Sequence, residues 1–118
     1  VLRPLQSAYF GNCIIFGNNQ QELSILEDNR EQLTFNFNHG LFKLNTDLSE
    51  RGFDVNSIEF INPLVNLEPG FKNVLSNNYG LDSSSQAVDQ GNFTDIITLD
   101  ILGNPRNNPD LGAIERVP

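Results

Sequence analysis

The sequence predicts an all-β protein, and three observations favour this class. Ala occurs only 3 times and Met is absent among the 118 residues, so good helix formers are scarce. Asn occurs 17 times, and this residue favours turns and tolerates left-handed backbone. The apolar segments are short and end in Asn or Gly, as strands bounded by turns do. A chain of this length is expected to form a single domain, residues 1–118.

Four short segments have the pattern of β-strands. They cover residues 13–16, 23–26, 33–37 and 41–44. The third is the clearest, because Leu33, Phe35 and Phe37 alternate with other residues and so share one face. Residues 46–51 can form one helical turn, with Thr46 as its N-cap and Gly52 after its end. We therefore expect at most one short helix.

Two parts of the chain resemble one another at a distance of 27 residues. At this offset Phe10 matches Phe37, and Cys13 matches Gly40, and each of these two small residues precedes two apolar ones. This spacing suits one coil of a right-handed parallel β-helix, in which each coil stacks on the one before it. The same similarity can arise by chance between two strands of a β-sandwich, so both architectures stay open on this observation alone.

Charge and cysteine content exclude several classes of protein. The net charge is −8 and no Lys or Arg cluster is present, which argues against nucleic acid or anionic lipid as a partner. No apolar run approaches the ~20 residues of a membrane span. A single cysteine rules out an internal disulfide framework and a cysteine-rich zinc site. The chain starts at Val1 without Met or a charged-then-apolar leader, so we expect a mature or excised fragment whose targeting signal lay upstream and was removed.

The last third of the chain contains ordered blocks with a specific resemblance. The blocks are Glu68-Pro69-Gly70-Phe71 with Tyr79-Gly80-Leu81, then Ser85-Gln86-Ala87-Val88-Asp89-Gln90-Gly91, then Asp100-Ile101-Leu102-Gly103-Asn104-Pro105-Arg106, and Asp110-Leu111-Gly112-Ala113-Ile114-Glu115. They resemble the closing segment of bacterial right-handed parallel β-helix proteins of the choice-of-anchor Q type, many of them from Bacteroides-like organisms, in the pectate-lyase-like superfamily. Three positions depart from that pattern, because Gln86 replaces Pro, Ile114 an aromatic residue and Glu68 an Asp.

The resemblance implies a fold and a class of function. Residues 1–61 would form β-helix coils, and residues 62–118 the closing coil and a carboxyl-terminal cap. The expected function is a non-catalytic module of a secreted or cell-surface protein, with a structural role or a role in binding carbohydrate or another ligand. The alternative is the end of a pectate-lyase-like polysaccharide lyase or a glycoside hydrolase. With only 2 Lys and no basic cluster here, its active site would lie mainly upstream.

One arginine lies among several acidic residues near the end of the chain. Arg106 is the only basic residue between Lys72 and Arg116. Its guanidinium offers five donors in a rigid fork, so it can join two carboxylates from separate loops. We therefore expect a buried or half-buried structural cap network made of Asp89, Asp100, Arg106, Asp110 and Glu115. Three glycines are expected where the chain turns sharply or approaches another backbone, namely Gly91, Gly103 and Gly112.

The same carboxylates leave two other interpretations open. Calcium takes six to eight oxygen ligands, and a pair of carboxylates serves glycoside hydrolysis. Arg106 would neutralise either site, so we assign no catalytic residue and no metal ligand, and keep calcium only as an alternative. His39, in register with Asn12, is expected to be a turn or ladder residue rather than a general base. Cys13 is expected to be an inert thiol buried in a strand.

Two kinds of partner follow from these interpretations. A polysaccharide could stack on aromatic side chains, although we expect most of these to lie in the core: Phe53, Phe60, Phe71, Phe93 and Tyr79. A coil with no other coil before it exposes apolar surface and a strand edge. We therefore also expect that a dimer could form through the amino-terminal coil around residues 10–16.

Overall fold

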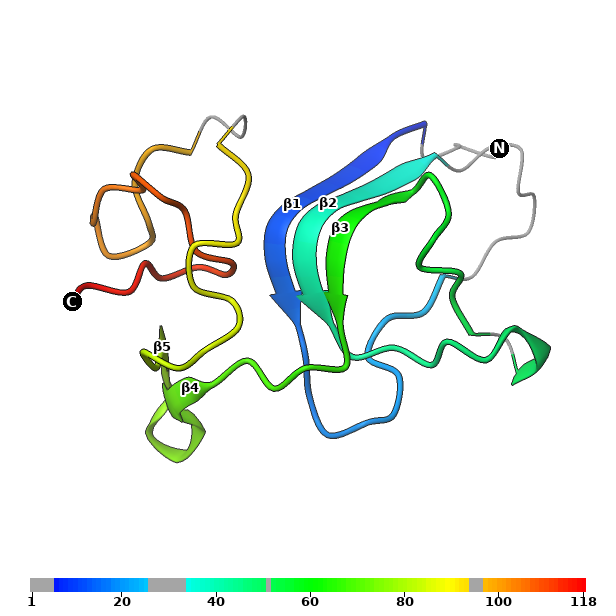
Figure 1. Ribbon diagram of the computed structural model, residues 1–118, viewed down its shortest axis with the longest axis horizontal. Coiled ribbons are helices and arrows are strands. Elements are labelled where there is room, and N and C mark those ends of the chain that lie inside the picture. The colour runs from blue at the N-terminus through cyan, green and yellow to red at the C-terminus, as the bar shows by residue number, and fades with distance from the viewer. Residues whose placement is uncertain (1–5, 26–33, 51, 94–96) are drawn as a thin grey trace, which may run out of the picture.

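Three parallel strands form the centre of the structure (Figure 1). The computed structural model describes residues 6–25, 34–50, 52–93 and 97–118. The strands lie side by side in the order β1 (Ala8–Ile15), β2 (Phe35–Phe42) and β3 (Phe60–Val65). A separate antiparallel pair follows, formed by β4 (Phe71–Asn73) and β5 (Asn78–Leu81).

Helical structure in the described part of the chain is limited to two short 3-10 turns. They are η2 (Leu48–Glu50) and η3 (Val74–Ser76). With strands as the main regular structure and almost no helix, the chain is all-β, and this part of the sequence prediction is confirmed.

The strands β1 and β2 pair at the interval that the internal similarity predicts. Phe10 lies opposite Phe37, and Cys13 lies opposite Gly40, 27 residues apart in both cases. The strand β3 continues this arrangement at a shorter interval, with Phe60 opposite Phe37. The rings of Phe10, Phe37 and Phe60 therefore stack in a column, with centroids 4.9 Å and 5.2 Å apart. These distances are close to the spacing of neighbouring strands, so the register aligns the rings.

Each of the three strands bends at one residue with left-handed backbone. These residues are Asn12, His39 and Asn62, with φ angles of 54°, 55° and 49°. They lie at the same level, because the residues on both sides of each bend pair across the sheet: Gly11, Asn38 and Ile61 before it, and Cys13, Gly40 and Pro63 after it. Asn and His are among the non-glycine residues that adopt this conformation most often. The three bends therefore lie side by side and give all three strands the same curved shape (Figure 1).

The bend changes which alternate residues face each side of the sheet. Before it, Phe35 and Phe37 face one side; after it, Phe42 and Leu44 face that same side. Without a bend, odd-numbered residues would have stayed on one face throughout. The intervening residue Leu41 instead faces the opposite side. After the bend, Phe42 and Leu44 rather than Leu41 therefore join Phe37 in the same core.

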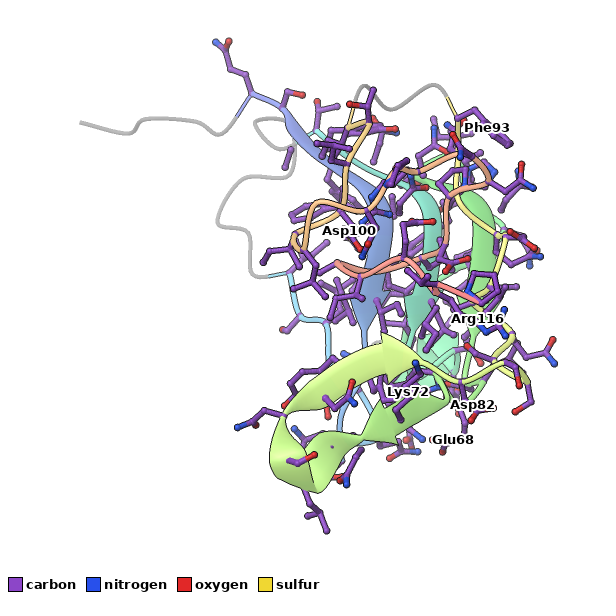
Figure 2. The ribbon with its side chains drawn as sticks, turned by 90° about the vertical axis from the view of Figure 1, so that its left-hand side faces the viewer. Glu68, Lys72, Asp82, Phe93, Asp100 and Arg116 are labelled. Atoms are coloured by element: carbon purple, nitrogen blue, oxygen red, sulfur yellow. The ribbon has the colours of Figure 1, made fainter. Side chains whose placement is uncertain are left out.

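The sheet has a separate apolar layer on each face. On the face that we call the crossover side, the strand residues pack against segments that connect the strands: Leu23, Ile25, Phe53 and Val55. On the other face, Leu41 packs against residues that follow β3 in the chain: Leu81, Ala87 and Leu111. Figure 2 shows the carboxyl-terminal part of the chain passing in front of the sheet. The segment after β3 thus covers a face of all three strands.

Several predicted elements differ from the observed ones. Residues 33–37 and 41–44 were expected as two strands, but the described part of both belongs largely to β2, because the bend at His39 does not interrupt pairing. Residues 23–25 have no regular strand pairing and supply apolar contacts instead, and Leu26 and Leu33 lie outside the described residues. The expected boundary between residues 61 and 62 falls inside β3, so residues 62–65 belong to the central sheet.

The predicted helical turn is present in shorter form as η2. Asp47 caps it in place of the predicted Thr46, since the carboxylate of Asp47 accepts a hydrogen bond from the Ser49 N–H at 2.9 Å. Gly52 ends the turn, and its N–H donates to the Asp47 carbonyl at 2.8 Å. Arg51 lies outside the described residues.

We predict that Phe37→Ala will lower the free energy of unfolding by about 3–5 kcal/mol, as truncation of a buried Phe does. Phe37 is 2% exposed and contacts the rings of both neighbouring strands in the column. Urea denaturation monitored by circular dichroism measures the loss. Phe93→Ala, at a side chain 69% exposed, is the control and should cost less than about 1 kcal/mol. Equal losses in the two variants would contradict the central position of Phe37.

Candidate functional site

The predicted cap residues include a buried ion pair. Arg106 donates from Nη1 to Oε1 of Glu115 at 2.7 Å, and the side chains are only 9% and 7% exposed. The guanidinium also donates to the carbonyl oxygens of Asp110 at 3.2 Å and Gly112 at 2.8 Å. Arg106 therefore joins one carboxylate and two backbone carbonyls, where the sequence led us to expect two carboxylates.

The other buried carboxylates bind backbone N–H groups. Asp100 accepts from the backbone N–H groups of Leu102, Asn104 and Glu115 at 2.7–2.8 Å, and from the Asn104 side-chain amide at 2.9 Å. A carboxylate in this position satisfies donors that have no partner in a strand or helix. Asp100 therefore fixes a loop that contains almost no regular secondary structure.

Asp110 links two further parts of the chain. Its carboxylate accepts the N–H of Asp89 at 2.7 Å and the N–H of Arg116 at 2.6 Å. Asp89 takes part through its backbone only, and its side chain is exposed. The buried set, which we call the carboxylate network, thus consists of Asp100, Arg106, Asp110 and Glu115 (Asp100 and Arg116 are labelled in Figure 2).

Two carboxyl groups of the network have pKa values that are shifted in opposite directions. Burial acts to raise the pKa of Asp100, but the hydrogen bonds from Asn104, Glu115 and Leu102 together outweigh it and lower this pKa to about 2. Burial raises the pKa of Glu115, with a further contribution from the Asp110 charge, against the Asp110 N–H and the Arg106 guanidinium. Asp100 is therefore held firmly as an anion, whereas charging Glu115 carries a desolvation cost.

The three predicted glycines lie at close approaches or turns in this region. The N–H of Gly91 donates to the Pro109 carbonyl at 2.7 Å, and a Cβ at Gly91 would lie 2.6 Å from that oxygen. Gly112 has a φ of 94°, and its N–H donates to the Asn12 carbonyl at 2.7 Å. Gly103 has a φ of 86°. Gly112 therefore fastens the carboxyl-terminal segment to β1.

A polar ladder crosses the bends of the three strands. The side-chain amide of Asn62 lies 3.1 Å from Nε2 of His39, and Oδ1 of Asn38 lies 2.5 Å from Nδ1 of the same ring. The Asn92 side chain donates to the same oxygen at 3.3 Å, and its backbone exchanges two bonds with the Asn12 side chain, at 2.6 Å and 3.1 Å. Both ring nitrogens of His39 are engaged, and its predicted role as a ladder residue is confirmed.

The described ranges of the chain hold neither a metal-binding group nor a membrane-spanning helix. They contain no group of three or more His, Cys, Asp or Glu side chains arranged to hold a metal ion. They also contain no helix that is long and apolar enough to cross a bilayer.

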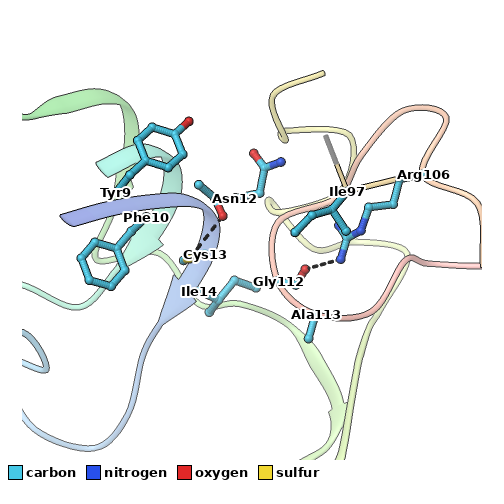
Figure 3. Close-up of a pocket in the computed structure, with 10 residues that line it drawn as sticks. Tyr9, Phe10, Asn12, Cys13, Ile14, Ile97, Arg106, Gly112 and Ala113 are labelled. Carbon is cyan, nitrogen blue, oxygen red and sulfur yellow. Dashed lines mark hydrogen bonds between the residues drawn. The ribbon is translucent and has the colours of Figure 1, made fainter. Parts of the chain in front are cut away.

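Two hollows flank β1. The larger, which we call the β1 groove, has a volume of about 730 Å³ and is lined by residues of β1 and of the carboxyl-terminal segment (Figure 3). Its walls include Tyr9, Phe10, Cys13, Ile97, Arg106 and Gly112. Cys13 is half-buried, and its thiol donates to the Gly11 carbonyl at 3.2 Å, so it is less enclosed than the sequence led us to expect.

The smaller hollow, which we call the Tyr79 hollow, has a volume of about 410 Å³. Three aromatic residues line it together with aliphatic side chains: Phe16, Phe71 and Tyr79. Tyr79 is 46% exposed and meets Phe71 edge to face at 5.4 Å. Of the other aromatic residues considered for sugar stacking, Phe60 is buried, Phe53 is half-buried, and Phe93 is exposed.

Comparison with known proteins adds no relative to this description. No protein-family model, no curated protein and no solved structure matches the chain. The resemblance to β-helix proteins therefore stays a prediction from the sequence.

We predict that Asp100→Asn will destabilise the protein at neutral pH by about 1–3 kcal/mol, because buried N–H donors lose an anionic acceptor. A lowered folded-state pKa gives stability that is present above the ordinary pKa of 3.8 and is lost as the pH falls towards about 2. The difference between wild type and variant should therefore shrink between about pH 5 and pH 2.

Denaturation at several pH values measures this difference, with the exposed Asp89→Asn as the control. Glu115 does not produce the same slope, because stability linked to a raised pKa is lost as the pH rises. A difference for Asp100→Asn that stays constant down to pH 2 would contradict the assigned role of this carboxylate.

Proposed function

We propose that the chain is a non-catalytic, right-handed parallel β-helix module of a secreted or cell-surface bacterial protein, with a structural and carbohydrate-binding role. One observation supports this proposal most strongly. The strands β1, β2 and β3 stack in parallel and in register, with a Phe column on the crossover side and a left-handed residue at the same level in each. Parallel strands joined by returning segments are the repeating unit of a β-helix coil.

The choice of a non-catalytic role rests on how the acidic side chains are used. Asp100 and Asp110 accept N–H bonds that hold loops together, and Glu115 is paired with Arg106. A catalytic carboxylate pair needs groups free to meet a substrate at a defined separation. Carboxylates that are engaged in this way with backbone N–H groups and with Arg106 are expected to stabilise the fold rather than to bind a substrate.

The Tyr79 hollow supports the carbohydrate-binding part of the proposal. Sugar rings present flat apolar faces to exposed aromatic rings, and ligand sites are typically concave and largely apolar. Tyr79 offers such a ring in a hollow lined by Phe16 and Phe71. The net charge of −8 would repel an acidic polysaccharide, so we expect a neutral one.

Binding to soluble polysaccharides tests the proposal. Isothermal titration with a panel of neutral β-glucans and mannans should show saturable binding of at least one polymer, and none of polygalacturonate. Tyr79→Ala should weaken the binding about tenfold, which corresponds to loss of about 1.4 kcal/mol. Tyr79→Phe should retain binding, since the ring is kept, and Phe93→Ala, which removes an exposed ring elsewhere, is the matched control.

Two outcomes would reject parts of the proposal. Lack of binding across the neutral panel, with the chain shown to be folded by its NMR spectrum, would exclude the carbohydrate role. Release of new reducing ends or unsaturated products from any polymer would exclude the non-catalytic role.

A further inference from the structure

A small hollow lies on the face of the β4–β5 pair that is opposite the Tyr79 hollow. Neighbouring residues of a strand point to opposite faces, and Phe71 lines the Tyr79 hollow whereas Lys72 lines the smaller one, which we call the Lys72 hollow. Its volume is about 180 Å³. Four side chains that can donate hydrogen bonds contribute to its wall: Lys72, Asn78, Asn104 and Arg116.

The lysine and the arginine of this hollow are not used in ion pairs. The structure describes four lysine and arginine residues. Arg106 is paired with Glu115, and Nζ of Lys43 lies over an aromatic ring, 5.1 Å from its centroid. Lys72 and Arg116 are the other two, and within the described ranges neither side chain forms an ion pair (both are labelled in Figure 2). Two uncompensated cations therefore line one hollow of an acidic protein.

Contacts with the hairpin and with the carboxylate network position these donors. A Cβ built at Gly80 would lie 3.6 Å from Cδ and 4.0 Å from Cε of Lys72, so the lysine stem crosses the glycine backbone. Oδ1 of Asn78 accepts the Gly80 N–H at 3.2 Å, which leaves its Nδ2 as a donor. The N–H of Arg116 donates to a carboxylate oxygen of Asp110 at 2.6 Å. Donors from two separate segments of the chain therefore meet at the hollow.

The acidic residues nearby are engaged with other groups. Glu115 lines the hollow, but its side chain is 7% exposed and is paired with Arg106. Asp82 interacts with the Arg116 charge and does not line the hollow. Its carboxylate accepts hydrogen bonds from the N–H of Ser84 at 3.0 Å and from the hydroxyl at 2.9 Å. Charges further away than the Debye length of ~8 Å act weakly on a single bound ion, whereas the net charge of −8 repels a polyanion along its whole length. The hollow is therefore locally cationic.

We propose that the Lys72 hollow binds a tetrahedral oxyanion group, a phosphate or a sulfate. A guanidinium donates two parallel hydrogen bonds to two oxygens of such a group, and an ammonium adds a second positive charge. Arg116 and Lys72 together balance the two negative charges of the anion, and the Asn78 amide is a further donor. This site stands whether or not the Tyr79 hollow binds carbohydrate.

NMR titration of the 118-residue chain with sodium phosphate at pH 8 tests the proposal, with the ionic strength held constant by sodium chloride. We expect saturable shifts of the Lys72, Gly80 and Arg116 amide signals, and at least tenfold weaker binding of acetate. Lys72→Gln and Arg116→Gln should each weaken phosphate binding about tenfold, because one cationic donor is lost. Lys43→Gln removes the same charge outside the hollow and is the matched control, which should bind phosphate as the wild type does.

Glucose 6-phosphate distinguishes two sources of the bound group. Tighter binding than that of inorganic phosphate assigns a phosphate carried by a sugar, and equal or weaker binding assigns the free ion. Shifts without saturation, or acetate binding as tight as phosphate binding, would overturn the proposal. An equal loss of affinity in Lys43→Gln and in the two hollow variants would overturn it as well, because only the overall charge would then matter.

Discussion

The left-handed residue in the middle of each central strand is the constraint on which the rest of the structure depends. An L-residue in this conformation costs free energy, and Asn and His bear the cost more easily than most. In return, each strand changes the face on which its alternate residues lie. At Asn12, His39 and Asn62 this change occurs at one level of the sheet. The bend thereby decides which residues of each strand join the apolar layer against the crossovers and which join the layer against the carboxyl-terminal segment.

Outside the sheet, Asn and Asp side chains bond many backbone groups that have no strand or helix partner. The amide of Asn66 bonds both the N–H and the carbonyl of Leu44, at 3.0 Å and 2.9 Å, as a neighbouring strand would. The side-chain amide of Asn12 does the same for the backbone of Asn92, and Asp100 accepts three backbone N–H groups in one loop. Buried backbone groups without partners are costly, so the high Asn and Asp content explains how long segments without regular structure can stay packed.

The sequence predicted the register of the sheet better than its extent. The match of Phe10 with Phe37 identified the correct pairing. Identical side chains that stack on neighbouring strands recur along the sequence at the interval that separates the paired residues. The third strand was missed, although Phe60-Ile61-Asn62-Pro63-Leu64-Val65 repeats the order Phe, left-handed residue, Leu of β2. Pro63 and the shorter interval of 23 residues concealed this similarity.

The candidate site was predicted in its membership but not in its contacts. The sequence predicted that Arg106 lies near the acidic residues, because it is a single basic residue in a segment that contains several carboxylates. The pairing of Arg106 with Glu115, and the exposure of the Asp89 side chain, depend on loop geometry that no local pattern encodes. The hollows beside β1 arise from packing of distant segments, and nothing in the sequence indicated them.

Nuclear Overhauser contacts between aromatic rings test the central claim most directly. Selective labelling of Phe allows the rings of the column to be assigned one at a time with Phe→Leu variants. The parallel register predicts contacts from the Phe37 ring to both Phe10 and Phe60, whose centroids lie 4.9 Å and 5.2 Å away. Contacts of Phe37 with only one of the two rings, or close Hα–Hα contacts between β1 and β2 of the kind that antiparallel strands give, would contradict the account.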